Sequence, residues 1–467
     1  MLHLSLAECA AALGAERRGD DSDTVRVDGV GIDTRTLEPG MLYVAIRGER
    51  FDGHDFVERA AEAGARAVLV ERALETTLPQ LVVPDTRLAL GALARHWAAR
   101  LHVPLVAITG SNGKTTVKEL VAAILAELGP VLATEGNLNN ELGVPLTLCR
   151  LAPEHRYAVV EMGASAAGEI AYLASIARPD VAVLTNVGPA HLEGFGTLAG
   201  VAAAKSELYA SLAPDGCAVV NADDAFVETF RAAIGTRRRR EFGRAKGCDV
   251  RAVDEGGDAP FVVETFGRRV DVPFALTGRH NRSNALAAIA AAQSLDVEMA
   301  TILDGLQRVD TVPGRLETTP SRSGATLIDD SYNANPASTR AALAVLAAAP
   351  GRRHLVLGDM GELGDDAETL HADIAEAAHE AGIDGLWTLG PLAGAAGRVW
   401  HRLAGGKLTA GHGGVARDAR GAHFVDVDAL IGALEPHLGA DVTVLVKGSR
   451  GSRMERVVAA LAAEAPS

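Results

Sequence analysis

The chain has 467 residues, 48% of them hydrophobic, which is enough for about three domains with cores of their own. Its formal net charge is −15, and its pI is near 5.4. Phosphate backbones are bound by clustered Lys and Arg, so this charge argues against a nucleic-acid-binding protein. The one basic run, residues 237–240, is expected to be a solvated loop or strand edge.

The cysteines and the hydropathy favour a cytoplasmic protein. The thiols show no CxxC spacing, which suits reduced cysteines better than disulfides or a zinc site. The first residues lack a basic start before an apolar core, and no apolar run reaches the roughly 18 residues of a membrane span. We therefore expect no membrane span. The cysteines are Cys9, Cys149, Cys217 and Cys248.

Residues 1–102 are predicted to form a small N-terminal domain of mixed α/β structure. The segments 31–48 and 51–71 combine strand and helix patterns, and a helix is expected to end near Arg100. An alternative is a two-domain protein in which this unit is only an appendage.

Residues 103–312 are predicted to form a central α/β domain of the P-loop type, with a parallel sheet and helices on both faces. Short apolar runs at 105–109, 157–163, 181–188 and 217–223 alternate with helical patterns, as in parallel sheets. Between residues 222 and 272 the pattern becomes irregular and charged, which indicates an insertion with a small sheet.

Residues 313–467 are predicted to form a third, Rossmann-like α/β domain. The dipeptide Pro313-Gly314 breaks the preceding helical pattern and marks the boundary. Further apolar runs at 325–331, 354–360 and 442–450 then predict another parallel sheet.

The sharpest motif is TGSNGKTT at 109–116, placed between a predicted strand and a predicted helix. Its glycines let backbone N–H groups face an anion, the helix N-terminus adds positive charge, Lys114 reaches terminal phosphates, and Thr115 can hold Mg²⁺. Ile108 stands where the general GxxxxGK[ST] pattern has its first glycine. The predicted nucleotide-binding residues of the loop are Gly110, Ser111, Asn112, Gly113, Lys114, Thr115 and Thr116.

Two further polar residues follow the carboxyl ends of predicted strands, where open α/β sheets bind ligands. Glu161 lies near the end of the run at 157–163, and His191 follows the run at 181–188 after a short loop. Together with Thr115 they can complete a hydrated Mg²⁺ or Mn²⁺ site. Taken alone, His191 is more often a capping or packing histidine.

Lys205 falls on the apolar stripe of a helix predicted over residues 198–212, together with Val201 and Leu208. A lysine that faces inward extends its amine to solvent, pairs with a carboxylate, loses its proton or is modified.

Several residues nearer the second boundary are predicted to contact nucleotide. Asn281 and Asn284 share one face of a helix start, where their simplest role is capping. Arg315 offers a guanidinium for phosphate, and Asp330 offers a carboxylate for ribose hydroxyls, with Asp329 as the alternative if the register slips by one.

The ordered motifs together resemble the Mur ligases, and among them the D-alanyl-D-alanine-adding branch. The motifs are DTR at 33–35, DGHDF at 52–56, TGSNGKTTVKE at 109–119, NLNNELGVPLT at 137–147, EMG at 161–163, AHLE at 190–193, KSEL at 205–208, DDSYNANPAS at 329–338, GDMGELG at 358–364 and LVKGSR at 445–450. SYNANP, GDMGELG and LVKGSR select this branch, as does the absence of a DNPR motif.

The resemblance implies roles for individual residues. Lys114, Glu161, His191 and Lys205 would be catalytic, with Thr115, Glu161, His191 and a carbamylated Lys205 as metal ligands. Asn281 and Asn284 would approach adenine. The substrate-binding residues would be Thr34, Arg35 and His54 at the UDP end, Asn139 and Asn140 at the muramoyl-peptide or amine, and Lys447 and Arg450 at the acyl phosphate and dipeptide.

The resemblance also implies the reaction. The terminal carboxylate of UDP-N-acetylmuramoyl-tripeptide would attack the γ-phosphate of ATP, and D-alanyl-D-alanine would then attack the acyl phosphate, giving the peptidoglycan precursor, ADP and phosphate. Small-molecule substrates, Mg²⁺ or Mn²⁺ and a monomeric enzyme are expected. The third residue of the tripeptide, lysine or diaminopimelate, stays open.

Three alternatives stay open at this stage. The chain could be another Mur-type or folylpolyglutamate-type amide ligase, a P-loop small-molecule kinase or ATPase, or a nucleotide-binding module without catalysis. The kinase alternative leaves the third domain and Lys205 unexplained.

Overall fold

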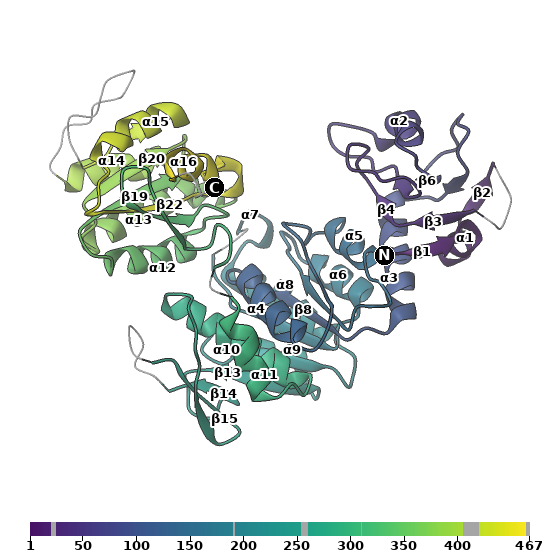
Figure 1. Ribbon diagram of the computed structural model, residues 1–467, viewed down its shortest axis with the longest axis horizontal. Coiled ribbons are helices and arrows are strands. Elements are labelled where there is room, and N and C mark those ends of the chain that lie inside the picture. Colours follow the sequence, from purple (N-terminus) through teal and green to yellow (C-terminus); the bar gives the residue numbers. More distant parts are fainter. Residues whose placement is uncertain (20–24, 190–191, 254–259, 310, 405–419, 464–467) are drawn as a thin grey trace.

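The computed structural model describes residues 1–467 except 20–24, 190–191, 254–259, 310, 405–419 and 464–467. Three units follow one another along the chain, and the first and last stand on either side of the central one (Figure 1). No helix in the described ranges is long and apolar enough to cross a membrane.

The N-terminal unit contains two small sheets. One pairs β1 (His3–Ser5) with β3 (Arg26–Asp28) antiparallel, and the other has the strand order β2-β7-β6-β5-β4. Ser5 and Glu8 form a capping box that starts α1, and Asp85 caps α3. The other bounds are β2 Glu16–Arg18, β4 Val30–Gly31, β5 Leu42–Val44, β6 Ala67–Val70, β7 Gln80–Val82, α1 Leu6–Leu13, α2 Val57–Glu62 and α3 Thr86–Leu101.

The central unit is built on one nine-stranded sheet of order β16-β15-β14-β13-β12-β11-β8-β10-β9, parallel from β9 to β14. The strands are β8 Leu105–Thr109, β9 Val131–Ala133, β10 Tyr157–Glu161, β11 Val181–Leu184, β12 Cys217–Asn221, β13 Arg238–Gly243, β14 Val250–Ala252, β15 Val262–Thr265 and β16 Arg268–Asp271.

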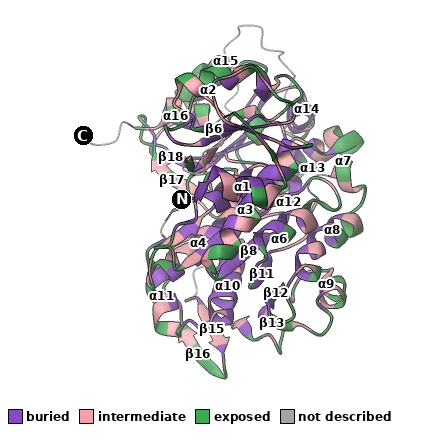
Figure 2. Ribbon diagram, turned by 90° about the vertical axis from the view of Figure 1, so that its right-hand side faces the viewer, coloured by how far each residue is buried: buried purple, intermediate pink, exposed green. Residues whose placement is uncertain are grey.

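Helices cover both faces of this sheet, as predicted. Successive residues of β8 point to opposite faces, so Val106 and Ile108 pack with α4, α10 and α11 while Leu105 and Ala107 pack with α5, α6 and α8. Figure 2 shows buried strands beneath helices whose outer faces are exposed. The helices are α4 Lys114–Ala126, α5 Gly143–Cys149, α6 Glu169–Ala177, α7 Leu192–Phe195, α8 Leu198–Ala210, α9 Val227–Ile234, α10 Arg279–Ser294 and α11 Met299–Gln307.

Residues 222–272 do not form a separate small sheet. β13 pairs in parallel with β12, and β14 to β16 then continue the same sheet, because the open edge of β12 offers backbone groups to the following strand. The basic run lies largely on β13 rather than in a loop. Arg237 donates to the carbonyl of Leu212 at 2.9 Å, and Arg240 lies over the ring of Phe266.

The C-terminal unit has a six-stranded sheet of order β17-β18-β22-β19-β20-β21, in which only β17 runs antiparallel. The strands are β17 Glu317–Pro320, β18 Thr326–Asp330, β19 Arg352–Gly358, β20 Gly385–Leu389, β21 His423–Phe424 and β22 Val442–Lys447. The helices are α12 Pro336–Ala347, α13 Ala367–Glu380, α14 Gly394–Leu403, α15 Val427–Leu434 and α16 Glu455–Leu461. Two hydrophobic clusters cover its two faces, which confirms the predicted α/β fold.

The two junctions between units differ in kind. The N-terminal unit shares one hydrophobic cluster with the central sheet, because α3 packs against α5 and α6. The apolar clusters of the C-terminal unit contain only residues of that unit. The predicted boundaries at 102 and 312 stay predictions.

Candidate functional site

The turn between β8 and α4 carries the TGSNGKTT motif and is held by hydrogen bonds to the residue that follows the neighbouring strand. Gly113 precedes α4 with φ of +81°, and Lys114 folds back so that its Nζ donates to the carbonyl of Gly110 at 3.0 Å. Asn186, after β11, accepts from the N–H of Asn112 at 3.1 Å and donates to its carbonyl at 3.0 Å. The neighbouring strand therefore fixes the turn.

Two glycines of this turn have neighbours that exclude any side chain. A Cβ on Gly110 would stand 1.9 Å from Oγ1 of Thr185, and a Cβ on Gly113 would stand 2.3 Å from Oδ1 of Asn284. Both glycines also have positive φ. The turn thus depends on close approach from β11 and α10.

Glu161 and Thr115 meet at the carboxyl ends of β10 and β8. Thr115 Oγ1 donates to Glu161 Oε2 at 2.9 Å, and Asn139 Nδ2 donates to Glu161 Oε1 at 2.8 Å. Glu161 is only 2% exposed. A hydroxyl and a carboxylate are oxygen donors of the kind that Mg²⁺ binds, so the residues fit the implied metal.

Lys118 helps to fix the backbone of Glu161 through Thr134. Its buried Nζ donates to the carbonyl of Thr134 at 2.7 Å, and the hydroxyl of Thr134 accepts from the N–H of Glu161 at 2.9 Å. The strand end that carries Glu161 is therefore fixed by hydrogen bonds on both sides.

Of the other two implied metal ligands, only Lys205 lies within the described residues. His191 lies outside the described residues. Lys205 lies on α8 and is 1% exposed, with its Nζ 5.8 Å from the ring centroid of Phe195. Burial, and secondarily the charge of Lys114, lower the pKa of Lys205 to about 7. The prediction that this lysine faces inward is confirmed, and the lowered pKa gives its amine a neutral fraction near pH 7 that an exposed lysine lacks.

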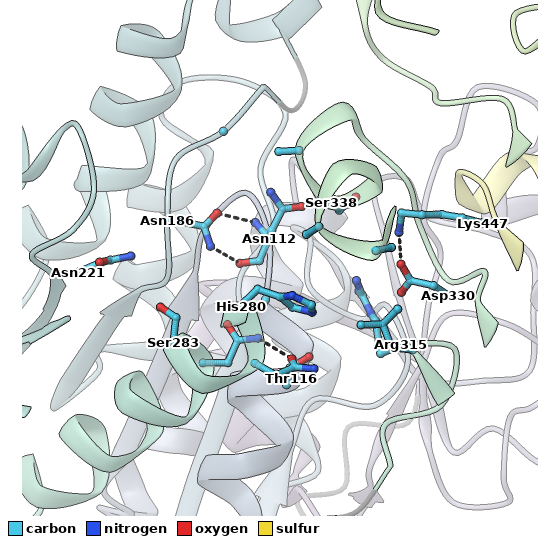
Figure 3. A pocket seen from close by; sticks show the side chains of 18 of the residues that line it. Asn112, Thr116, Asn186, Asn221, His280, Ser283, Arg315, Asp330, Ser338 and Lys447 are labelled. Atoms are coloured by element: carbon cyan, nitrogen blue, oxygen red, sulfur yellow. Dashed lines mark hydrogen bonds and ion pairs between the residues drawn. The ribbon is translucent and has the colours of Figure 1, made fainter. Parts of the chain in front are cut away.

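A cavity of about 330 Å³, here called cavity A, lies between the central and C-terminal units. In Figure 3, Asn112 and Asn186 line one side and the pair Asp330 and Lys447 the other, with His280 and Arg315 between them. Asn281 and Asn284 also line it, held by hydrogen bonds to the Thr277 carbonyl and to each other.

A second cavity of about 620 Å³, cavity B, opens on the other side of Lys114. Its walls carry amides, hydroxyls, carboxylates and guanidinium groups from both units. They include Ser111, Lys114, Asn139, Asn140, Glu161, Ser165, Glu169, Arg315, Tyr332, Asn335, Ser449 and Arg450. Asn140 also accepts from the N–H of Gly143 at 2.9 Å and so caps the start of α5.

Arg315 lines both cavities and a small pocket of about 30 Å³ at the turn itself. Its Nη2 donates to Thr115 Oγ1 at 3.3 Å, across the junction between the two units. Its Nε is buried and has no hydrogen-bond partner among the described residues. A guanidinium with an unused donor at the junction of two cavities is suited to an anion that bridges them.

The sequence grouped Lys447 with Arg450, and the structure separates them. Lys447 is buried in cavity A, where its Nζ donates to Asp330 Oδ2 at 2.5 Å and to the carbonyl of Asn333 at 3.0 Å. Burial lowers the pKa of Lys447, and the carboxylate of Asp330 opposes that shift. Arg450 lies in cavity B. Ser449, which comes just before η4 (Arg450–Ser452), also lines cavity B, so the chain passes from one cavity to the other between Lys447 and Ser449.

The three residues predicted for the UDP end lie near one another in sequence but differ in access. The side chain of His54 is fully buried, and its two ring nitrogens contact Asp52 Oδ1 at 2.5 Å and the N–H of Glu71 at 2.8 Å. Arg35 is exposed and pairs with Asp33 at 2.6 Å. Thr34 is partly exposed in the same turn. His54 therefore holds the fold of this unit, while Arg35 is free to reach a ligand.

Sequence reasoning missed several residues that line the cavities. They are Asn186, Asn221, His280, Tyr332, Asn335 and Ser338. Asn335 donates from Nδ2 to Asn112 Oδ1 at 2.8 Å and thus links the two units. Tyr332 and Asn335 belong to the SYNANP motif, which pointed to this region without showing which side chains face the junction.

Comparisons with known proteins agree with this architecture. Sequence models match the chain over residues 26–98 (Mur ligase family, catalytic domain), 108–292 (Mur ligase middle domain) and 314–450 (Mur ligase, glutamate ligase domain). The chain belongs to the Mur ligase family. Each matched range falls inside one of the three expected units of this Mur ligase.

Several named Mur ligases resemble it over nearly their whole length. UDP-N-acetylmuramoyl-tripeptide–D-alanyl-D-alanine ligase of Escherichia coli (strain K12) is 44% identical, with 99% of each chain covered. A crystal structure of MurF from Acinetobacter baumannii superimposes with a TM-score of 0.88 at 36% identity, covering 98% of each chain. MurF ligase from Thermotoga maritima in complex with ADP gives a TM-score of 0.78 at 29% identity, covering 93% of this chain and 96% of that one.

Proposed function

We propose that this Mur ligase joins D-alanyl-D-alanine to the terminal carboxylate of UDP-N-acetylmuramoyl-tripeptide, with ATP converted to ADP and phosphate. The observation that carries the proposal is that Arg315 and the turn at 110–115 stand between two cavities, one suited to a nucleotide and one to peptides. The full-length similarity to ligases named for this reaction supports it.

Cavity A is the proposed ATP site. Asn281 and Asn284 provide amides for the adenine edge, and Asp330, oriented by Lys447, provides a carboxylate for the ribose hydroxyls. The phosphates lie on the turn, where the N-terminus of α4 and Lys114 offset their charge. The Thermotoga maritima ligase was solved in complex with ADP, which supports the use of ATP by this chain.

A divalent cation, Mg²⁺ or Mn²⁺, is proposed at Thr115 and Glu161, with His191 and a carbamylated Lys205 completing the metal sites. When bound, it neutralises charge on the phosphates. The neutral form of the Lys205 amine, which the lowered pKa makes accessible, is a nucleophile toward CO₂. Carbamylation would replace a buried cation with an anion.

Cavity B is the proposed peptide site. Its Asn139 and Asn140 wall adjoins the N-terminal side of the molecule, and its Arg450 wall belongs to the C-terminal unit. We assign the first wall to the muramoyl-peptide and the second to the dipeptide. The carboxylate then meets the γ-phosphate near Lys114 and Arg315, whose positive charges reduce the repulsion between two anions.

The dipeptide amine next attacks the acyl carbon of the acyl phosphate, and phosphate leaves with the bonding electrons. Cations that held the γ-phosphate remain placed to stabilise the phosphate as it leaves. The carboxylates of Glu161 and Glu169 line cavity B together with positively charged groups. This mixture of charges suits a substrate that has both an amine and a carboxylate.

The N-terminal unit is assigned to the uridine nucleotide, with Thr34 and Arg35 as contacts and His54 acting through the shape of its turn. We further propose a monomeric, cytoplasmic enzyme. The acidic overall charge favours local anion binding over a broad basic surface.

An assay of ADP release with purified enzyme, Mg²⁺, UDP-N-acetylmuramoyl-tripeptide and a panel of amines tests the proposal. D-Alanyl-D-alanine should be strongly preferred, and mass analysis should find the pentapeptide product. Preference for diaminopimelate or glutamate would replace the proposal with another amide ligase. ATP turnover without any amine requirement would replace it with a kinase or ATPase.

A further inference from the structure

The ring of Tyr332 has two guanidinium groups against it. The Cζ of Arg315 lies 4.4 Å from the ring centroid, and the Cζ of Arg450 lies 5.9 Å from it. All three residues line cavity B. Cations within about 6 Å of an aromatic centroid are attracted by the negative face of the ring.

Tyr332 is itself fixed at the junction between the central and C-terminal units. Its N–H donates to the carbonyl of Gly314 at 3.3 Å, and its hydroxyl donates to the carbonyl of Gly136 in the central unit at 3.4 Å. Gly314 directly precedes Arg315, so the backbone that carries Arg315 and the ring that holds its guanidinium are tied together. The ring therefore has a defined position when the units are in contact.

The two guanidinium groups lie at different parts of the site. Arg315 reaches Thr115 at the phosphate turn, and it lines cavity A as well as cavity B. The side chain of Arg450 is 63% exposed and, besides the Tyr332 ring, has a 3.7 Å ion pair with Glu455, so its donors are accessible to a ligand in cavity B. Two cations this close repel each other, and the ring offsets part of that repulsion.

We propose that Tyr332 is a positioning residue that holds Arg315 toward the ATP phosphates and Arg450 toward the carboxylate of the incoming dipeptide. The inference rests on the proposed function. It makes one aromatic ring the common support for the step that forms the acyl phosphate and for recognition of the amine substrate.

Two substitutions distinguish the contribution of the Tyr332 ring from that of its hydroxyl. Tyr332→Leu removes the ring, and we expect kcat to fall and the KM for D-alanyl-D-alanine to rise, each by about tenfold. Tyr332→Phe keeps the ring, and both constants should stay within about threefold of the unsubstituted chain. The KM for UDP-N-acetylmuramoyl-tripeptide should change little in either variant, because that substrate is assigned to the opposite wall.

A matched control removes another arginine-aromatic contact. Phe266→Leu deletes the ring 5.2 Å from Arg240, in the turn between β15 and β16, and should leave all three constants alone. Equal kinetics for Tyr332→Leu and Phe266→Leu would overturn the inference. A uniform change in every KM together with a lowered Tm would overturn it too, because it would indicate a structural role only.

A binding measurement keeps this result separate from failure of the proposed function. Affinity for a non-hydrolysable ATP analogue tests the Arg315 arm without any amine, and Tyr332→Leu should weaken it by about tenfold while Tyr332→Phe does not. If the unsubstituted chain fails to use D-alanyl-D-alanine but the analogue result holds, the proposed function fails and the role of the ring on Arg315 stands. Unchanged analogue affinity in Tyr332→Leu would overturn that role.

Discussion

Thr115 Oγ1 donates a 2.9 Å hydrogen bond to Glu161 Oε2, although 46 residues separate them in the chain. Thr115 lies at the start of the helix after β8 and Glu161 is the last residue of β10; these strands are adjacent and parallel, so the sheet itself brings the two residues together. Asn139 and Thr134 hold the carboxyl group and its backbone N–H. The proposed metal ligands are thus oriented before any ligand arrives, which is the condition for efficient electrostatic stabilisation.

Glu161→Gln should lower kcat by about 10²- to 10³-fold, because the substitution removes the negative charge while keeping the shape of the side chain. Steady-state ADP release at several Mg²⁺ concentrations measures the effect, and the Mg²⁺ needed for half-maximal rate should rise. Glu368→Gln, an exposed change on α13, is the matched control. Activity close to that of the control would show that Glu161 does not act in the reaction.

Lys205 should respond to CO₂. Since burial lowers its pKa to about 7, the neutral amine that reacts with CO₂ becomes more abundant as the pH rises through that value. Added bicarbonate should therefore raise activity more at about pH 8 than at about pH 6, and carbon-13 NMR with labelled CO₂ should show one carbamate. Lys205→Ala should lose both responses, whereas the exposed change Lys246→Ala should keep them. A labelled carbamate in Lys205→Ala of equal intensity would assign the modification elsewhere.

Gly113→Ala should damage nucleotide binding. The new Cβ would stand 2.3 Å from Asn284 Oδ1 and would also sit at a φ of +81°. Strain at such a φ alone costs about 1 kcal/mol or more, and displacement of Asn284 adds to it. Gly267→Ala provides the control, with a φ of +71° and nothing within 4 Å of the added Cβ. Both variants should lose stability in urea unfolding, but only Gly113→Ala should also lose affinity for an ATP analogue.

His354 should make stability depend on pH. It is 1% exposed, accepts a hydrogen bond from Trp387 Nε1 at 3.1 Å, and has an unpartnered Nε2 within the described structure. Burial, with smaller contributions from Arg352 and His437, lowers its pKa to about 4 from the ordinary 6.5. Between these values the unfolded chain binds a proton that the folded chain does not, so stability falls as the pH drops from about 6.5 towards about 4.

The magnitude of this effect is up to about 3 kcal/mol, since one pKa unit corresponds to about 1.4 kcal/mol. Urea unfolding of the chain at several pH values measures this loss of stability. His354→Asn keeps an acceptor for Trp387 and removes the titration, so it should be less stable near neutral pH but show a shallower loss on acidification. An unchanged slope would assign the acid sensitivity to other groups.

Local patterns in the sequence predicted much of the fold and of the phosphate-binding turn. The alternation of apolar strands and helices predicted the central and C-terminal sheets, and the TGSNGKTT motif placed Lys114 and Thr115 correctly at the start of α4. Both inferences depend only on residues within about two turns or strands of each other, where periodicity and turn chemistry are informative.

Relationships across the junction could not be predicted in the same way. The contact of Arg315 with Thr115 spans 200 residues, and the hydrogen bond from Asn335 to Asn112 spans 223. Lys447 and Arg450 are three residues apart, yet they lie in different cavities, because Lys447 ends β22 and the chain leaves the sheet directly after it. The continuation of the central sheet through β13 was also missed, because arginine-rich strands lack the apolar pattern of a buried strand.

The apolar junction of the N-terminal unit and the polar junction of the C-terminal unit predict different freedom of movement for the two units. An apolar core cannot be opened without exposing it to water, so the N-terminal unit and central sheet should move as one rigid body. The C-terminal unit meets the central unit through polar links such as Arg315 to Thr115 and Asn335 to Asn112, which water can replace at little cost. We therefore expect only the C-terminal unit to move during turnover, while the N-terminal unit, the proposed site of the uridine nucleotide, stays fixed to the central sheet.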